Sequence, residues 1–172
     1  MPNPFIEPPA SIAWEEADSP IGTFLLAGAD RTLVAVRLPG TWAKEDVPDT
    51  WEHEPGAMTG AAAQLAEYFD GTCRGFSLHL APHGTAFQRS VWAALCDVGY
   101  GTTASYRDVA TAVGNPKATR AVGMANNRNP IALVVPCHRV VGADGSLTGY
   151  GGGISMKSWL LDHERQVLAR RT

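Results

Sequence analysis

The sequence lacks the features that mark secreted and membrane proteins. It has only three cysteines among 172 residues, Cys73, Cys96 and Cys137, and their spacings match no disulfide framework. No segment approaches the roughly 20 consecutive apolar residues of a membrane-spanning helix, and the first residues lack the basic and apolar regions of a secretory signal. We therefore expect a protein of a reducing compartment, the cytoplasm.

The sequence also lacks an excess of basic charge, because its net charge is −3, but the charges are unevenly distributed. Residues 1–82 carry twelve acidic and four basic residues, a net −8, whereas residues 83–172 carry ten basic and five acidic residues, a net +5. This asymmetry indicates two functional halves, the basic one suited to an anion such as nucleic acid. Ordinary scatter of surface charge explains the same numbers equally well at this point.

The acidic half has the pattern of a small α/β domain. Residues 22–38 contain two segments that alternate like strands around the turn-like Ala29 and Asp30, which predicts a hairpin in an antiparallel sheet. Residues 57–69 place apolar side chains on one helical face, and residues 76–80 have the pattern of another strand.

No group of residues has the spacing of a metal or cofactor site. Cys73, His79 and His83 are near one another in sequence, but they lack a fourth ligand and a close cysteine pair. We predict no metal and no cofactor.

Helical patterns replace strand patterns in the basic half. Thr85 is suited to cap a first helix that runs to Val98 and places Cys96 in the core. Ser105 with Asp108 forms a capping-box start for a second helix, which a glycine ends.

A third helix follows after a minimal turn. Asn115 and Pro116 supply an N-cap and a first-turn proline for residues 117–126, and Gly114 lies in the turn, as in a helix-turn-helix. Between Tyr106 and Val141 five basic residues stand against one acidic residue, a net +4, which favours DNA as the partner. A simple helical hairpin with a solvated basic face is the alternative.

The switch from strand to helix patterns falls near residue 83. We therefore predict an α+β fold. A small N-terminal α/β domain with an antiparallel sheet spans residues 1–82, and a mostly helical C-terminal domain spans residues 83–172 and carries the helix-turn-helix.

An apolar run, Ile131–Val135, has the pattern of a short buried strand, and Pro136 closes it immediately before Cys137 and His138. Positive charge from His138 and Arg139 would favour the thiolate, the nucleophilic form of cysteine. Because neighbouring residues on a strand point apart, His138 would act through a water or with its other nitrogen held by a carboxylate. Packing and chance also explain an isolated Cys-His pair.

The residues PCHRVV, Pro136 to Val141, resemble the active-site signature of the O6-alkylguanine-DNA alkyltransferases. The resemblance continues in order and spacing through GTAFQRSVWAAL, SYRDVA, GNPKATRAVGMA, RNP, GSLTGYGGG and KSWLLDHE. The acidic half resembles this family's N-terminal domain only in length and strand content.

The resemblance implies roles for particular residues. Cys137 would accept the alkyl group, His138 would be its water-mediated base, Glu164 would orient His138, and Asn129 would support the thiol network. Tyr106 would donate a hydrogen bond to the purine. Arg120 would fill the space left by a flipped base, and the other implied DNA contacts are Tyr106, Lys117, Ala121, Gly123, Ala125 and Arg128. The implied pocket residues are Asn126, Val140, Tyr150, Gly151 and Gly152.

The implied function is repair of O6-alkylguanine, mainly O6-methylguanine, in double-stranded DNA, with O4-methylthymine as a further substrate. The resemblance also implies that the helix bearing Arg120 lies in the minor groove of the DNA. Transfer to a cysteine would be irreversible and would consume the protein. Two alternatives are a protein that only recognises alkylated DNA or regulates through its helix-turn-helix, and a thiol hydrolase, which would leave the helix bearing Arg120 unexplained.

Overall fold

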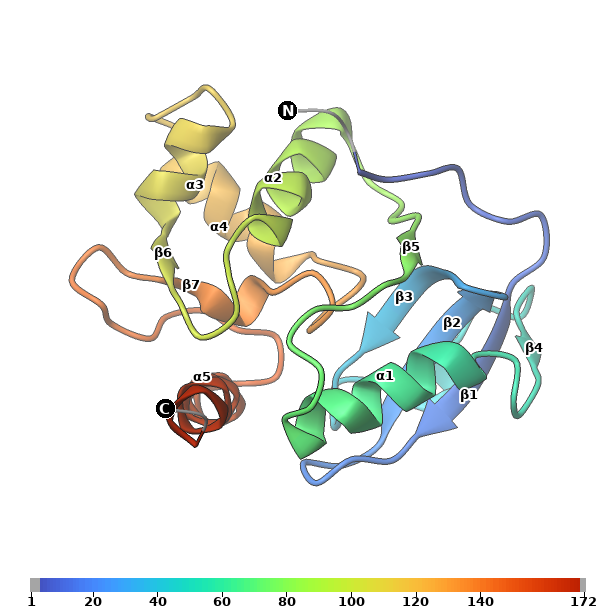
Figure 1. The fold of residues 1–172 in the computed structure, drawn as a ribbon. Coiled ribbons are helices and arrows are strands. Elements are labelled where there is room, and N and C mark those ends of the chain that lie inside the picture. The colour runs from blue at the N-terminus through green and yellow to red at the C-terminus, as the bar shows by residue number, and fades with distance from the viewer. Residues whose placement is uncertain (1–3, 171–172) are drawn as a thin grey trace. The chain divides into compact units, whose positions relative to one another are not determined.

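A computed structural model of the chain describes residues 4–170, which form two compact units (Figure 1). The N-terminal unit comprises Pro4–His83 together with Pro130–Val134, and the C-terminal unit comprises Gly84–Asn129 and the chain from Val135 onward. A single boundary near residue 83 therefore does not account for the segment Pro130–Val134. No helix among the described residues is both long enough and apolar enough to cross a membrane.

A five-stranded sheet forms the N-terminal unit, in the order β4-β1-β2-β3-β5. Its elements are β1 (Ala13–Ala17), β2 (Phe24–Ala29), β3 (Thr32–Arg37), the 3-10 turn η1 (Lys44–Asp46), β4 (Glu52–His53), α1 (Thr59–Asp70) and β5 (His79–Leu80). The first three strands pair antiparallel, which confirms the predicted hairpin, while the short edge strands pair parallel to their neighbours. Gly28 lies at a bulge where a Cβ atom would collide with the Thr32 carbonyl, so only glycine fits.

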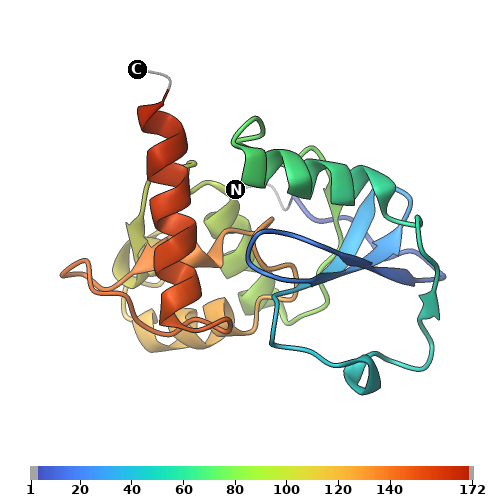
Figure 2. The same ribbon diagram turned by 90° about the horizontal axis from the view of Figure 1, so that it is seen from below.

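Both faces of this sheet are covered, which explains why β2 is almost entirely buried. On one face Phe24 lies against Phe69 of α1, with ring centroids 5.9 Å apart, and Figure 2 shows α1 along that face. Strand alternation turns Leu25 to the opposite face, where it joins a core cluster against which Trp42 of the connecting loop packs. The sheet therefore has a helix on one side and a loop on the other.

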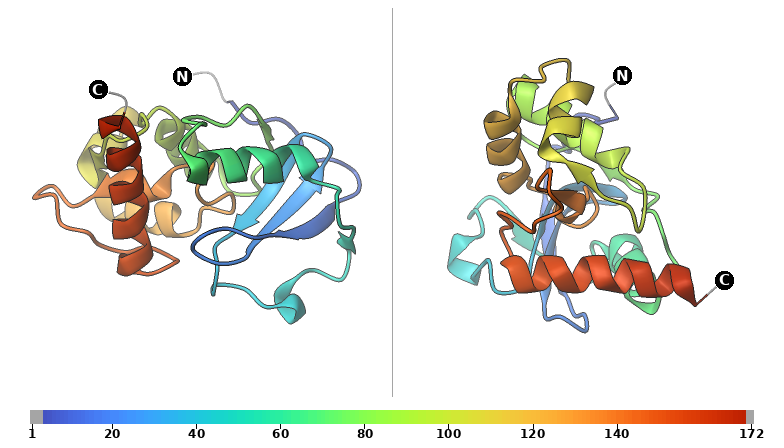
Figure 3. Two further views of the ribbon diagram at one scale, coloured as in Figure 1. Left: turned by 60° about the horizontal axis from the view of Figure 1, so that its bottom comes forward. Right: turned by 90° about the vertical axis from the view of Figure 1, so that its left-hand side faces the viewer.

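The C-terminal unit is mostly helical, and the predicted α+β fold class is confirmed. Its elements are α2 (Ala86–Cys96), β6 (Ala104–Ser105), α3 (Tyr106–Ala112), α4 (Thr119–Asn127), the 3-10 turn η2 (Cys137–Arg139), β7 (Val140–Val141) and α5 (Ile154–Ala169). Helices α3 and α4 lie side by side, and α5 is a long helix that lies apart from this pair (Figure 3). The predicted caps are present, because Thr85 accepts a hydrogen bond from Gln88 N and Ser105 accepts one from Asp108 N.

Two details of the predicted helices are wrong. Helix α4 begins at Thr119, and Pro116 lies instead in a turn that Ala118 N closes by donating to Asn115 O at 2.9 Å. Proline's fixed φ suits such a turn as well as it suits a helix start, so the sequence signal is ambiguous. Cys96 is exposed at the last residue of α2 rather than packed in the core.

The apolar run expected to form a strand ends in a tight turn instead. Ile131 makes only an isolated bridge to Val36, and Val134 N then donates to Ala132 O at 2.9 Å around Leu133, whose φ is +72°. A positive φ is strained for leucine, but its side chain is only 1% exposed, and that burial helps to offset the strain. Apolar β-branched residues signalled burial here, not an extended backbone.

Candidate active site

Cys137 begins the 3-10 turn η2, directly after a second tight turn. Cys137 N donates to Val135 O at 2.8 Å around Pro136, whose φ of −81° and ψ of 63° are those of an inverse γ-turn. The prediction that the thiol ends a strand is therefore wrong. Because a 3-10 turn rotates successive residues by a third of a turn, Cys137 and His138 point in different directions, as they would on a strand.

Two asparagines at the end of α4 hold this turn in place. Asn126 is 2% exposed and donates from Nδ2 to the carbonyl of Cys137 at 3.3 Å. Asn129, two residues after α4 ends, donates from Nδ2 to the carbonyl of Val135 at 2.8 Å. The structure thus brings both predicted residues to the backbone that carries the thiol.

His138 and Glu164 form a fully buried hydrogen-bonded pair. His138 Nε2 lies 2.8 Å from Glu164 Oε1, and neither side chain is exposed. Burial lowers the pKa of His138 below its usual range, against the opposing effect of Glu164, so the imidazole is neutral near pH 7. Nε2 then carries the proton shared with the carboxylate, and Nδ1 is left as a buried acceptor with no hydrogen-bond partner in the described residues.

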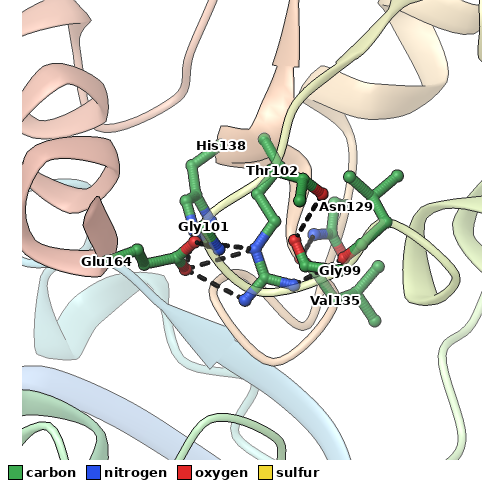
Figure 4. A network of polar contacts seen from close by, with 9 residues as sticks. Gly99, Gly101, Thr102, Asn129, Val135, His138 and Glu164 are labelled. Carbon is green, nitrogen blue, oxygen red and sulfur yellow. Dashed lines mark hydrogen bonds and ion pairs between the residues drawn. The ribbon is translucent and has the colours of Figure 1, made fainter. Parts of the chain in front are cut away.

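Figure 4 shows Glu164 beside His138, but it is Arg139 that balances the charge of Glu164. Its Nη2 lies 2.9 Å from Glu164 Oε1 and its Nε lies 3.1 Å from Oε2, while Nη1 donates to the Val98 carbonyl at 2.6 Å. Gly101 N donates to Glu164 Oε2 at 2.8 Å. Burial alone would raise the pKa of Glu164, but the hydrogen bonds and charges of His138 and Arg139 outweigh it and hold the pKa at about 2.

Lowering the pH is expected to destabilise the protein through this cluster. The pKa of Glu164 is depressed from 4.5 to about 2, so the stability it contributes is present above pH 4.5 and is lost as the pH falls toward 2. The pKa of His138 is also depressed, so below pH 6.5 the unfolded chain gains a proton that the folded chain does not. Unfolding free energies measured from pH 7 to pH 3 should fall in both windows, by about 2 kcal/mol for Glu164 by pH 3.

The variant Glu164→Gln separates the loss of stability below pH 4.5, which we assign to Glu164, from the loss below pH 6.5, which we assign to His138. It removes the titrating carboxylate and leaves the Arg139 charge unpaired, so it should lose about 3–5 kcal/mol at pH 7 and show a flatter profile below pH 4.5. Asp162→Asn, an exposed change on the same helix, should keep the wild-type profile. If Glu164→Gln runs parallel to the wild type below pH 4.5, other carboxylates control acid unfolding.

Tyr106 and Lys157 meet at one backbone carbonyl. The Tyr106 hydroxyl donates to Thr148 O at 3.1 Å, and Lys157 Nζ donates to the same oxygen at 2.8 Å. Burial raises the pKa of Tyr106, partly offset by the Thr148 hydrogen bond, and burial lowers the pKa of Lys157, partly offset by the Cys137 thiolate. Both groups are therefore close enough to Cys137 to respond to its charge.

The other predicted pocket residues differ in exposure. The Tyr150 hydroxyl is buried without a hydrogen-bond partner in the described residues, and burial, reinforced by the charges of Cys137 and Glu164, raises its pKa well above 10. Val140 is fully buried, whereas Gly151 is exposed and Gly152 is partly exposed. Tyr150 thus offers an unused buried hydroxyl near the thiol.

Most of the residues predicted to face DNA lie at the surface of the helix-turn-helix. They are Lys117, Arg120 and Arg128, which are exposed, and Tyr106, Ala121 and Gly123, which are partly exposed. Ala125 differs, because it is 2% exposed and its carbonyl accepts a hydrogen bond from Trp92 Nε1 at 2.9 Å. Ala125 packs inside the C-terminal unit, so the prediction that it contacts DNA is wrong.

Two family models together match most of the chain. The DNA-binding domain of 6-O-methylguanine DNA methyltransferase matches residues 86–166, and the ribonuclease-like domain of the same protein matches residues 12–82. The chain belongs to the 6-O-methylguanine DNA methyltransferase family. This confirms the resemblance based on PCHRVV. It also shows that the acidic half belongs to the same family, although no sequence motif there had indicated it.

Relatives in this methyltransferase family match the chain over nearly its whole length. A methylated-DNA–protein-cysteine methyltransferase of Methanosarcina acetivorans is 50% identical over 147 residues, 86% of this chain and 94% of its own. One from Mycolicibacterium paratuberculosis is 48% identical over 155 residues, 90% and 93% of the two chains. The crystal structure of Mycobacterium tuberculosis OGT in complex with DNA superposes with a TM-score of 0.84 at 46% identity, covering 90% and 94%.

The sequence motifs did not predict the contacts of two charged residues at the candidate site. Arg139 was expected only to supply positive charge near the thiol, and Lys157 was not singled out. A signal for Lys157 exists in its spacing: it precedes Glu164 by seven residues, two helical turns, and shares a face with Leu160. A lysine on the apolar face of a helix indicates a buried polar partner.

Proposed function

We propose that this chain repairs alkylated DNA by moving an alkyl group from O6 of guanine in duplex DNA to Sγ of Cys137. One observation carries the proposal: Cys137 shares a buried 3-10 turn with His138, whose ring is hydrogen-bonded to Glu164. Family membership supports it, and the related Mycobacterium tuberculosis OGT has been crystallised in complex with DNA. The exposed basic face of α4 supplies a surface for the duplex.

The chemistry needs no cofactor. The neutral His138 accepts the thiol proton on Nδ1 through an intervening water, and Glu164 stabilises the imidazolium that forms. The thiolate attacks the alkyl carbon, the bond from that carbon to O6 breaks, and its electron pair remains with the purine. The proton then passes to the purine ring, which leaves as guanine. Because the thioether does not hydrolyse, each molecule reacts once.

Tyr106 must change partners during this reaction. Its hydroxyl is bonded to the Thr148 carbonyl, and in our proposal an entering base takes that hydrogen bond in place of Thr148. Lys157 keeps its own bond to Thr148 and places a positive charge near the thiolate. Tyr150 provides a further buried hydroxyl for the base.

The DNA-binding and alkyl-acceptor activities are assigned to the C-terminal unit, which comprises Gly84–Asn129 and the chain from Val135 onward. Flipping a nucleotide out of the duplex requires a few kcal/mol for unstacking, which Arg120 offsets by occupying the vacated space. Lys117 and Arg128 are suited to phosphate contacts. In a cell without a nucleus, such a protein works in the cytoplasm, where the DNA lies.

Mass spectrometry of the intact protein tests this function. After incubation with an excess of duplex DNA containing O6-methylguanine, the protein should gain one methyl group, which peptide mapping should place on Cys137 alone. A protein that only recognises alkylated DNA would bind the duplex and gain no mass, and a thiol hydrolase would show no lasting modification. Cys96 serves as an internal control, because it is exposed and yet should stay unmodified.

A further inference from the structure

Helix α4 carries a large apolar side chain in the middle of its exposed face. Met124 is 56% exposed, more than any other exposed large hydrophobic residue in the described chain. It follows Arg120 by four residues and precedes Arg128 by four, so the three side chains lie one above another along the helix. Both arginines are exposed as well.

Two of the residues near Met124 on the helix are small, whereas Asn127, three residues after Met124, is polar and exposed. Ala121 and Gly123 are partly buried, and a Cβ atom on Gly123 would lie 3.8 Å from the Tyr106 ring. Val122, on the opposite side, is fully buried. Met124 is therefore the large apolar side chain among small and polar neighbours on the exposed side of α4, and more than half of it is open to solvent.

We propose that Met124 packs against the deoxyribose walls of the minor groove and supplies affinity for duplex DNA that does not depend on sequence. This inference rests on the function proposed above. The B-DNA minor groove is about 6 Å wide, whereas a helix with its side chains is about 10–12 Å across. Helix α4 can therefore enter the minor groove only if it presents a side with small residues and if the groove widens. Widening exposes the apolar faces of the sugars.

The charges beside Met124 favour DNA over a protein partner. Arg128, the C-cap of α4, follows Met124 by four residues and is suited to a phosphate beside the sugar contact, while Arg120 on the other side occupies the space of the flipped base. Met124 lies one helical turn, about 5.4 Å, from Arg120 and therefore outside the space of the flipped base. An unbranched, flexible methionine adapts to sugars of any sequence, as repair of lesions in any context requires.

Three variants test the proposal with the whole protein and a duplex containing O6-methylguanine. Met124→Gln keeps the length of the side chain but makes it polar, Met124→Leu keeps it apolar, and all three residues favour helix. Ile6→Gln is the matched control, because Ile6 is 45% exposed in the N-terminal unit. Fluorescence anisotropy gives the duplex affinity at several salt concentrations, and single-turnover kinetics give the transfer rate.

Met124→Gln should weaken duplex binding about three- to tenfold, whereas Met124→Leu and Ile6→Gln should stay within about twofold of the wild type. The slope of log affinity against log salt should be unchanged in Met124→Gln, because no phosphate contact is lost. In Arg128→Ala the magnitude of that slope should fall by about 0.9, because one phosphate contact is lost. The transfer rate at saturating DNA and the reaction with the free base O6-methylguanine should both be unchanged.

Wild-type affinity in Met124→Gln would overturn the proposal, and so would an equal loss in Met124→Leu. A loss confined to the transfer rate would instead make Met124 part of base flipping and would contradict the sugar contact. The proposed function fails independently: a wild-type protein that never gains a methyl group, while Met124→Gln still weakens DNA binding, would refute alkyl transfer and keep the DNA contact.

Discussion

Replacing Cys137 by serine or alanine is expected to abolish alkyl transfer, by at least about 10⁴-fold, and to leave duplex binding within about twofold of the wild type. In our proposal the Cys137 thiol forms the new bond, and serine cannot replace it because a hydroxyl is much less acidic and much less nucleophilic than a thiol. The Cys137 side chain is 4% exposed and contributes no surface to the basic face of α4. Binding and chemistry should therefore separate cleanly.

The measurement combines intact-protein mass with anisotropy on the same DNA. Cys96→Ser and Cys73→Ser are matched controls, since neither thiol belongs to the His138 and Glu164 cluster, and both should transfer methyl at the wild-type rate. A full methyl gain by Cys137→Ala would refute the central assignment. Loss of both activities in Cys137→Ala, with an unchanged circular dichroism spectrum, would mean that the thiol also shapes the DNA surface.

Arg120→Ala is expected to lose repair of duplex DNA by about 10- to 10³-fold and to react with the free base at nearly the wild-type rate. The loss follows from the few kcal/mol of unstacking that the arginine offsets, each 1.4 kcal/mol being worth a factor of ten. The free base needs no flipping. Arg120 is exposed on α4, whereas Cys137 is buried in η2, so removal of the Arg120 side chain should leave the pocket intact.

Tyr106→Phe provides the opposite pattern. Its hydroxyl is proposed to act on the purine itself, so its loss should slow reaction with both the duplex and the free base, by about tenfold or more. Single-turnover rates on the two substrates give the comparison. If Arg120→Ala slows both substrates equally while its circular dichroism matches the wild type, the arginine acts within the pocket and the flipping role is wrong.

Features that depend on neighbours in sequence could be predicted. The cap at Thr85 and the capping box at Ser105 need only a donor or acceptor three residues away, so the local sequence specifies them. The hairpin between β2 and β3 depends on alternation and one turn. The motif around Cys137 likewise identified the thiol, its imidazole neighbour and, through resemblance, Glu164.

Features that depend on partners far along the chain could not be predicted. Leu133 adopts a positive φ because the surrounding core buries its side chain, and the apolar run alone indicated a strand. Arg139 forms hydrogen bonds with the Glu164 carboxylate and the Val98 carbonyl, which lie 25 and 41 residues away in sequence. Lys157 donates a hydrogen bond to the Thr148 carbonyl, which lies on the loop before α5.

The sequence was therefore sufficient for the helix-turn-helix and the α+β class, because short-range patterns encode both, while the role of Cys137 is a prediction that rests on the family resemblance. The pairing of Glu164 with Arg139, and the burial that lowers the pKa of His138, arise only when α5 packs against η2. Burial removes water from these groups, and the resulting shifts in pKa depend on which charges the fold brings together. No local pattern specifies that environment, because its members come from separate segments of the chain.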